Sequence, residues 1–213
     1  KYAVCRNFGR ADIMKLYIIR HGETSWNVQR RLQGASDTDL NENGITLAKR
    51  TGEALKEIPF DLCFTSPLKR AKMTAELILA GRDIPIYDDE RLREISFGEW
   101  EGRDSALLPA HMLDNFFHHT EVYEPPKGGE SIREICTRTK DFFQELICRE
   151  KLQDKTLLIA SHGCAVRALL QNVYSDAAIK NFWHGCVPPN CGVNIVEVAD
   201  GRAELLEEYV VFG

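Results

Sequence analysis

Residues 15–27 read KLYIIRHGETSWN, and this stretch decides the fold. The apolar run from Leu16 to Ile19 is typical of a short strand that is buried on both faces. The run stops at Arg20-His21-Gly22, where we expect Gly22 to allow a sharp turn. An arginine and a histidine are therefore predicted at the carboxyl end of an interior strand, where open α/β sheets bind ligands. Taken alone, the stretch fits equally well a strand that ends in two solvated polar residues.

Two later segments repeat this pattern. Residues 61–65, DLCFT, are predicted to form a strand, and Ser66-Pro67 then supplies the N-cap and first-turn proline of a helix that contains Arg70. Residues 156–160, TLLIA, are predicted to form another strand, which ends at Ser161-His162-Gly163 in front of a further helix.

The remaining segments continue an alternation of strands and helices. They are a helix capped by Asn41 or Asn43, a strand at 84–87, a long amphipathic helix at 131–149, and strands at 192–198 and 204–211 joined by Asp200-Gly201. The predicted fold is a three-layer α/β/α sandwich whose mostly parallel central sheet is closed by an antiparallel C-terminal hairpin.

Length and composition predict a single domain. The chain has 213 residues, of which 44% are hydrophobic and 28% charged, as in ordinary globular proteins. We expect the domain to span 14–213, and residues 1–13 to be an N-terminal extension or leader. Residues 104–127 mix aromatic residues, histidines and prolines without a sustained period, so we expect a lid-like insertion there.

Charge and cysteine usage exclude several classes of protein. The net charge of −5 and the scattered arginines argue against binding nucleic acid. Seven cysteines without a C-x-x-C spacing indicate reduced thiols in the cytoplasm. The sequence contains no apolar run that could cross a bilayer and does not indicate an oligomeric state.

The three strand ends predict a common site. Parallel strands would bring two histidines and two arginines to one edge of the sheet, beside the first turns of two helices. Arginine guanidinium groups donate paired hydrogen bonds to the oxygens of a phosphoryl group, and helix N-termini add partial positive charge beside them. A histidine in that position can attack phosphorus and form a covalent phosphohistidine.

Five ordered motifs resemble those of the histidine phosphatase superfamily, also called phosphoglycerate mutase-like, over residues 15 to about 211. The motifs are Arg20-His21-Gly22-Glu23-Thr24 with Trp26-Asn27, Gln33-Gly34, Thr65-Ser66-Pro67-Leu68-Lys69-Arg70-Ala71, Leu92-Arg93-Glu94 and Ser161-His162-Gly163. The resemblance implies that His21 is the phosphorylated nucleophile and Glu94 the proton donor, without metal or cofactor. The residues implied to bind the phosphoryl group or substrate are Arg20, Asn27, Gln33, Gly34, Arg70, His162 and Gly163.

Chemistry also favours a carboxylic acid at the site. An alkoxide leaves poorly, so its oxygen should gain a proton as the bond to phosphorus breaks. Glu99 and Glu101 are alternatives to Glu94, but they flank Trp100 in a probable turn, whereas Glu94 follows a predicted strand directly.

The resemblance favours the broad phosphatase branch. FGEWEG at 97–102 and PPKGGES at 125–131 are similar to that branch, which hydrolyses small phosphate monoesters. The alternative is a 2,3-bisphosphoglycerate-dependent phosphoglycerate mutase, which must grip a second acidic group. The insertion offers only Lys127 and three histidines for this purpose. A catalytically silent module that binds sugar phosphates or phosphoproteins is a third hypothesis.

Other residues admit two interpretations each. Cys164 could be a nucleophile or a packed thiol, and we favour the packed thiol. Glu130 and Ser131 fit the capped start of a helix, and no G-K-[ST] follows the GGES glycines, which disfavours a kinase.

Four residues could form a metal-binding face but are more often scattered surface residues: His111, Asp114, His118 and His119. Four aromatic residues could stack on a substrate, although we favour packing within the insertion: Phe116, Phe117, Tyr123 and Trp183.

Overall fold

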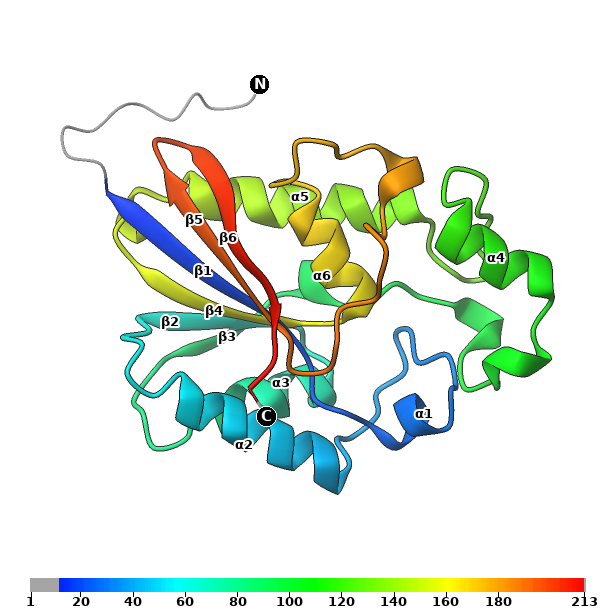
Figure 1. Cartoon of the computed structure of the whole chain (residues 1–213), viewed down its shortest axis with the longest axis horizontal. Helices are drawn as coiled ribbons and strands as arrows, with labels where there is room; N and C mark the ends of the chain where they lie inside the picture. The colour runs from blue at the N-terminus through cyan, green and yellow to red at the C-terminus, as the bar shows by residue number, and fades with distance from the viewer. Residues whose placement is uncertain (1–11, 213) are drawn as a thin grey trace.

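The computed structural model describes residues 12–212 and contains a six-stranded mixed sheet (Figure 1). The strand order is β3-β2-β4-β1-β5-β6. Strand β4 pairs parallel with both β1 and β2, β2 pairs parallel with β3, and β5 pairs antiparallel with β1 and β6. The strands are β1 (Ile13–Arg20), β2 (Leu62–Thr65), β3 (Ile86–Asp88), β4 (Thr156–Ser161), β5 (Val193–Ala199) and β6 (Arg202–Val210). The predicted α/β sheet with an antiparallel C-terminal hairpin is confirmed.

Helices cover both faces of this sheet. Helices α2 and α3 lie on one face, and α5 and α6 lie on the other (Figure 1). The α-helices are α1 (Ser25–Val28), α2 (Glu42–Ala54), α3 (Lys69–Ile78), α4 (Ala110–His118), α5 (Ile132–Ile147) and α6 (Gly163–Leu170). Short 3₁₀-helices occupy Glu90–Leu92, Gly98–Trp100, Ser105–Leu107, Glu150–Leu152 and Ile179–Asn181. Within residues 12–212, no helix has both the length and the apolar composition needed to cross a bilayer.

Strand β1 is the centre of both cores. Leu16 and Ile18 pack into the cluster under α5 and α6, whereas Tyr17 and Ile19 pack into the cluster under α2 and α3. This alternation follows from the pleat of the strand, which sends successive side chains to opposite faces. Burial on both faces explains why the strand reads as a continuous apolar run.

The segment 104–127 carries α4 and belongs to a third apolar cluster. Phe116 of α4 contacts the rings of Phe97, Tyr123 and Trp183 at centroid distances of 5.2, 4.9 and 5.2 Å. Trp183 Nε1 also donates a hydrogen bond of 2.6 Å to the carbonyl of Phe116. Packing of these aromatic residues is therefore observed, and it joins α4 to the chain that follows α6.

Two local expectations need correction, and one open choice is resolved. Strand β1 begins at Ile13, which pairs with Ala199, so the sheet includes a residue that we expected to belong to an extension. Residues 1–11 of that extension lie outside the described residues. The helix expected directly after Ser66 begins at Lys69 and has no side-chain N-cap. Asn41 caps α2, which resolves the choice left open by the sequence.

Candidate active site

Two histidines meet at the carboxyl edge of the sheet. Strands β1 and β4 run parallel with Arg20 opposite Ser161. The next residues, His21 and His162, therefore lie side by side, with ring centroids 5.2 Å apart. Arg70 follows β2, the other neighbour of β4, in the first turn of α3. The convergence predicted from the three strand ends is observed, whereas the roles of these residues stay predictions.

The hydrogen bonding of His21 defines its free nitrogen. Its Nδ1 lies 2.7 Å from the carbonyl of Gly22, and a carbonyl only accepts, so Nδ1 carries the proton. Nε2 therefore keeps its lone pair. Burial lowers the pKa of His21 well below 6.5, and the charges of Arg70 and Arg20 add to the effect. The ring is thus neutral at physiological pH.

The loop before β5 supports Arg20 and His21. Arg20 Nη1 donates 2.6 Å to the carbonyl of Pro188, and Asn190 Nδ2 donates 2.9 Å to the carbonyl of His21. Sequence reasoning missed Asn190. The only signal was its place after Pro188-Pro189, which marks a turn but does not show what the turn contacts.

Two glycines lie close to groups of other elements. Gly22 does not adopt a left-handed conformation. A Cβ on Gly22 would instead lie 2.6 Å from the carbonyl oxygen of Gly44 in α2. A Cβ on Gly163 would lie 3.2 Å from Val187 Cγ1 and 3.6 Å from both Arg20 Nε and Glu94 Oε2. Gly163 therefore lies between a basic and an acidic side chain, and a Cβ there would crowd only Val187.

Arg70 is fully buried and held by a loop. Its Nη1 and Nη2 donate to the carbonyls of Ser36 and Gly34 at 2.6 and 2.7 Å. Burial lowers the pKa of Arg70 to about 10, which leaves the guanidinium protonated at neutral pH. Desolvation likewise lowers the pKa of Arg20. Gly34 thus contributes to the site by orienting Arg70 through its carbonyl.

His162 adjoins His21 and is fully buried. Its Nε2 is 2.7 Å from Ser66 Oγ, which also accepts from Leu68 N at 3.3 Å just before α3 begins. Burial, followed by the charge of Arg70, lowers the pKa of His162 well below 6.5. Nδ1 of His162 has no hydrogen-bond partner among the described residues.

Buried nitrogens without partners gather here. Besides His162 Nδ1, the Nε groups of Arg20 and Arg70 are buried and have no partner within residues 12–212. Buried polar groups are nearly always hydrogen-bonded, so unpartnered ones require an explanation. A tetrahedral anion in this position would accept from several donors at once.

The carboxylate of Glu94 caps α6. Its Oε2 accepts from Cys164 N and its Oε1 from Ala165 N, both at 3.1 Å. Glu101 instead accepts from Ala35 N, Ser36 Oγ and Phe97 N, which fixes the loop that orients Arg70. Of the three candidate glutamates, only Glu94 lines the cavity described below.

Asn27 and Gln33 make hydrogen bonds within the protein. Asn27 Oδ1 accepts from Thr24 N at 3.1 Å in the capping box of α1. Gln33 Oε1 accepts from Thr24 Oγ1 and Thr38 Oγ1 at 3.0 and 2.8 Å. Both residues line the cavity, but these bonds assign them first to the shape of the loop.

The cavity above these residues has a volume of about 290 Å³. Every residue of the expected site lines it except His162, whose ring adjoins that of His21. Its apolar wall consists of Trp26, Leu32, Phe97, Leu113, Phe116, Phe117, Trp183 and Val187. Arg30 and Arg31 also line it, whereas Lys127 and the histidines of the insertion do not. Basic residues therefore come from the loop after α1, which we did not expect.

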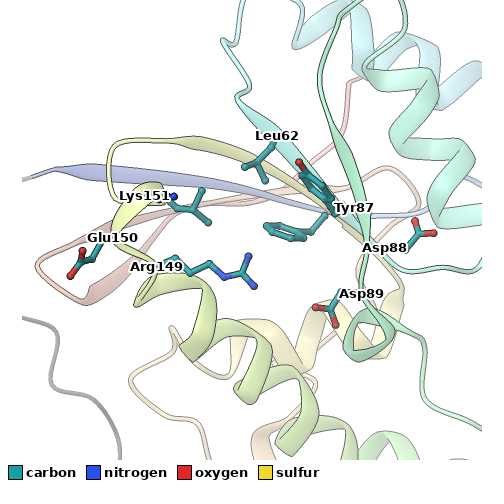
Figure 2. Close-up of a pocket in the computed structure, with 9 residues that line it drawn as sticks. Leu62, Tyr87, Asp88, Asp89, Arg149, Glu150 and Lys151 are labelled. Carbon is teal, nitrogen blue, oxygen red and sulfur yellow. The ribbon is translucent and has the colours of Figure 1, made fainter.

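A larger hollow of about 740 Å³ lies at another edge of the sheet (Figure 2). Leu62, Tyr87 and Arg149 contribute to it, with acidic residues at its rim. It contains no histidine and none of the residues of the expected site, so its size does not make it the active site.

Comparison with known proteins agrees with this geometry. Residues 16–210 match the model of the histidine phosphatase superfamily, branch 1. The chain belongs to this superfamily. It is 32% identical to the adenosylcobalamin/alpha-ribazole phosphatase of Salmonella typhimurium, over 90% of this chain and 94% of that protein. It is 33% identical to 2,3-bisphosphoglycerate-dependent phosphoglycerate mutase 2 of Gloeobacter violaceus, over 74% of each chain.

A solved structure extends the similarity to three dimensions. YhfR of Bacillus stearothermophilus superimposes with a TM-score of 0.83 and 35% identity, covering 90% of this chain and 95% of that one. The fold is therefore that of the phosphoglycerate mutase-like histidine phosphatases, as the motifs predicted.

Two alternative chemistries find no support in this histidine phosphatase. Cys164 is buried, and desolvation raises the pKa of its thiol well above the ordinary value, which makes it a poor nucleophile. Among residues 12–212, no three His, Cys, Asp or Glu side chains lie close enough together to hold a metal ion, so the face at His111, Asp114 and His118 does not form one.

The two buried histidines predict acid sensitivity of this histidine phosphatase. Their folded-state pKa values lie below 6.5, so the unfolded chain binds more protons and the free energy of unfolding falls as the pH drops below about 6.5. Each ring contributes up to about 1.4 kcal/mol per pH unit. Urea unfolding between pH 7.5 and 5.5 measures this slope, and His21→Gln should make it shallower. Identical slopes for the two proteins would contradict a depressed pKa at His21.

Proposed function

We propose that this chain hydrolyses small phosphate monoesters through a phosphohistidine at His21. One observation carries the proposal: the free lone pair of the neutral His21 ring adjoins the unpartnered Nε–H groups of Arg20 and Arg70 and the unpartnered Nδ1 of His162. The two guanidinium groups supply the positive charge that a phosphoryl group requires, and the lone pair supplies the attacking electrons.

The first step transfers the phosphoryl group. His21 Nε2 forms a bond to phosphorus while the bond from phosphorus to the ester oxygen breaks. The two guanidinium groups stabilise the charge on the phosphoryl oxygens, and Glu94 in its acid form gives a proton to the departing oxygen. Glu94 can do so because it lines the same cavity as His21.

The second step restores the enzyme. Water attacks phosphorus, the bond between nitrogen and phosphorus breaks, and the Glu94 carboxylate accepts the proton from water. Inorganic phosphate then leaves with His21 neutral again. Nothing in this sequence of steps requires a metal ion, because arginine and histidine side chains provide the electrostatic stabilisation.

The cavity wall supports an apolar or aromatic leaving group. Phe116, Phe117 and Trp183 would contact that group beyond the phosphoryl site. The similarity to an alpha-ribazole phosphatase over nearly the full length of both proteins supports hydrolysis as the reaction.

A phosphoglycerate mutase is the second candidate. Arg30 and Arg31 line the cavity and make no ion pair among the described residues, so they are available to a second acidic group. The similarity to a mutase covers 74% of the chain, and the similarity to the ribazole phosphatase covers 90%.

Hydrolysis of p-nitrophenyl phosphate in the presence of EDTA tests the proposal. We expect continuous release of nitrophenol at a rate that the chelator does not change. Isomerisation of 3-phosphoglycerate without hydrolysis of the nitrophenyl ester would favour the mutase. Binding of phosphate with neither reaction would favour the silent module.

A further inference from the structure

Every N–H group of the Arg138 guanidinium donates a hydrogen bond to a neighbouring residue. From α5, its Nε donates to Glu130 Oε1 at 2.7 Å, and its Nη2 donates to Glu130 Oε2 at 2.8 Å. Its Nη1 donates to the carbonyls of Arg91 and Arg93, both at 2.7 Å, and its Nη2 also donates to the carbonyl of Glu94 at 3.1 Å. An arginine has five N–H donors in a fixed plane, so all five are used.

The segment that Arg138 contacts has little regular structure of its own. The 3₁₀-helix ends at Leu92, and residues 93–96 belong to neither a helix nor a strand. Upstream, Ser161 Oγ donates 2.7 Å to the carbonyl of Leu92. The backbone of Glu94 therefore depends on tertiary hydrogen bonds for its position.

Glu130 in turn fixes the guanidinium plane. It belongs to the GGES stretch, where Ser131 and Glu134 form the capping box of α5 and Glu130 does not take part. The Glu130 backbone N–H donates 2.8 Å to the carbonyl of Ser96, just beyond Glu94. The carboxylate of Glu130 holds Arg138 from one side while the carbonyls accept from the other, and both side chains are about one-fifth exposed.

We infer that Arg138 is a positioning residue for the proton donor. Its planar fork holds three carbonyls of the segment 91–94 and thereby keeps the Glu94 carboxyl at the first turn of α6, beside the phosphoryl site. Arg138 does not line the cavity, so it acts through Glu94 and not on the substrate. This inference rests on the proposed function, in which Glu94 protonates the leaving oxygen.

A pair of substrates isolates the action of Glu94. Phenyl phosphate and p-nitrophenyl phosphate have similar shapes, but phenolate needs a proton far more than nitrophenolate does when it leaves. We define the leaving-group ratio as kcat/KM for the nitrophenyl ester divided by kcat/KM for the phenyl ester. Glu94→Gln should raise this ratio by about tenfold or more, because it removes the proton donor.

Arg138→Lys should raise the same ratio by about three- to tenfold. Lysine keeps the charge but offers one ammonium in place of a five-donor plane, so the segment shifts and proton transfer weakens. In the Glu94→Gln background, Arg138→Lys should leave the ratio unchanged, since residues that act as one unit are not additive. Arg91→Lys is the matched control. Arg91 also links this segment to α5, through Glu145, but its side chain does not touch Glu94.

Each outcome decides the inference. The inference is overturned if Arg138→Lys lowers kcat/KM equally for both esters. It is also overturned if Arg138→Lys still raises the leaving-group ratio in the Glu94→Gln background, or if Arg91→Lys raises the ratio by the same factor. If Arg138→Lys fails to fold in a thermal-unfolding assay, Glu130→Gln replaces it, and an unchanged ratio there would also overturn the inference. If wild-type protein hydrolyses neither ester, the proposed function fails and this inference fails with it. If the wild type hydrolyses both esters and the leaving-group ratio changes only in Glu94→Gln, the inference about Arg138 fails while the proposed function stands.

Discussion

His21→Ala should abolish hydrolysis of p-nitrophenyl phosphate, lowering kcat by at least about a thousandfold. The reason is that, within residues 12–212, His21 is the only histidine that lines the cavity, and Nε2 of the neighbouring His162 contacts Ser66. Steady-state kinetics measures the loss. Rapid acid-free quenching with a labelled ester should detect a phosphoryl-enzyme in the wild type and none in the variant.

His111→Ala is the matched control for this experiment. His111 is exposed on α4 and does not line the cavity, so its removal should leave kcat within about twofold of wild type, as is usual for exposed surface positions. A His21→Ala protein that folds normally and retains a substantial fraction of the wild-type kcat would show that another group is the nucleophile.

Arg70→Lys should lower kcat/KM by about 100- to 1,000-fold, comparable to the loss of one donor in an oxyanion hole. Lysine keeps one charge, but it cannot donate to the carbonyls of Gly34 and Ser36 and to a phosphoryl oxygen at the same time. The two carbonyls would lose buried hydrogen bonds, which costs about 1–3 kcal/mol of stability each. Kinetics combined with urea unfolding measures both effects.

Arg82→Lys separates activity from stability in this comparison. Arg82 also donates to two backbone carbonyls, those of Leu55 and Ile58, but it does not line the cavity. We expect the Arg82→Lys variant to have a lower free energy of unfolding and the same kcat/KM as the wild type. Equal loss of kcat/KM in the two variants would indicate that Arg70 serves only the fold.

The sequence predicted the parts of the fold that depend on local pattern. The apolar runs of β1 and β4 identified two interior strands, and Asp200-Gly201 identified the hairpin of β5 and β6. Parallel pairing then implied that His21 and His162 would be neighbours. These predictions succeeded because a strand buried on both faces and a two-residue turn have few alternative structures.

The parts that sequence reasoning missed depend on long-range hydrogen bonds. Serine is a residue type that often caps helices, yet the Ser66 hydroxyl contacts His162. The local preference for capping does not predict this tertiary contact. Asn190 and Arg138 donate to backbone carbonyls of residues far away in the chain. Because every residue has a backbone carbonyl, the sequence does not show which one accepts. Composition therefore gave no signal for either contact.

The insertion illustrates a different limit. A mixture of aromatic residues and histidines between 104 and 127 predicted a lid, but it could not show how tightly the segment packs. Phe116 and Trp183 join α4 to the chain after α6 through ring contacts and one hydrogen bond. The apolar wall of the cavity is thus built from side chains that also form a core, which favours a preformed binding site.

The pairing of β1 with β4 also determines when during synthesis the protein can become active. His162 follows β4 and lies 162 − 21 = 141 residues after His21. A ribosome must therefore add all of those residues before the second imidazole exists beside the first. Fragments that end before β4 would carry His21 without His162, and we expect them to lack the proposed activity.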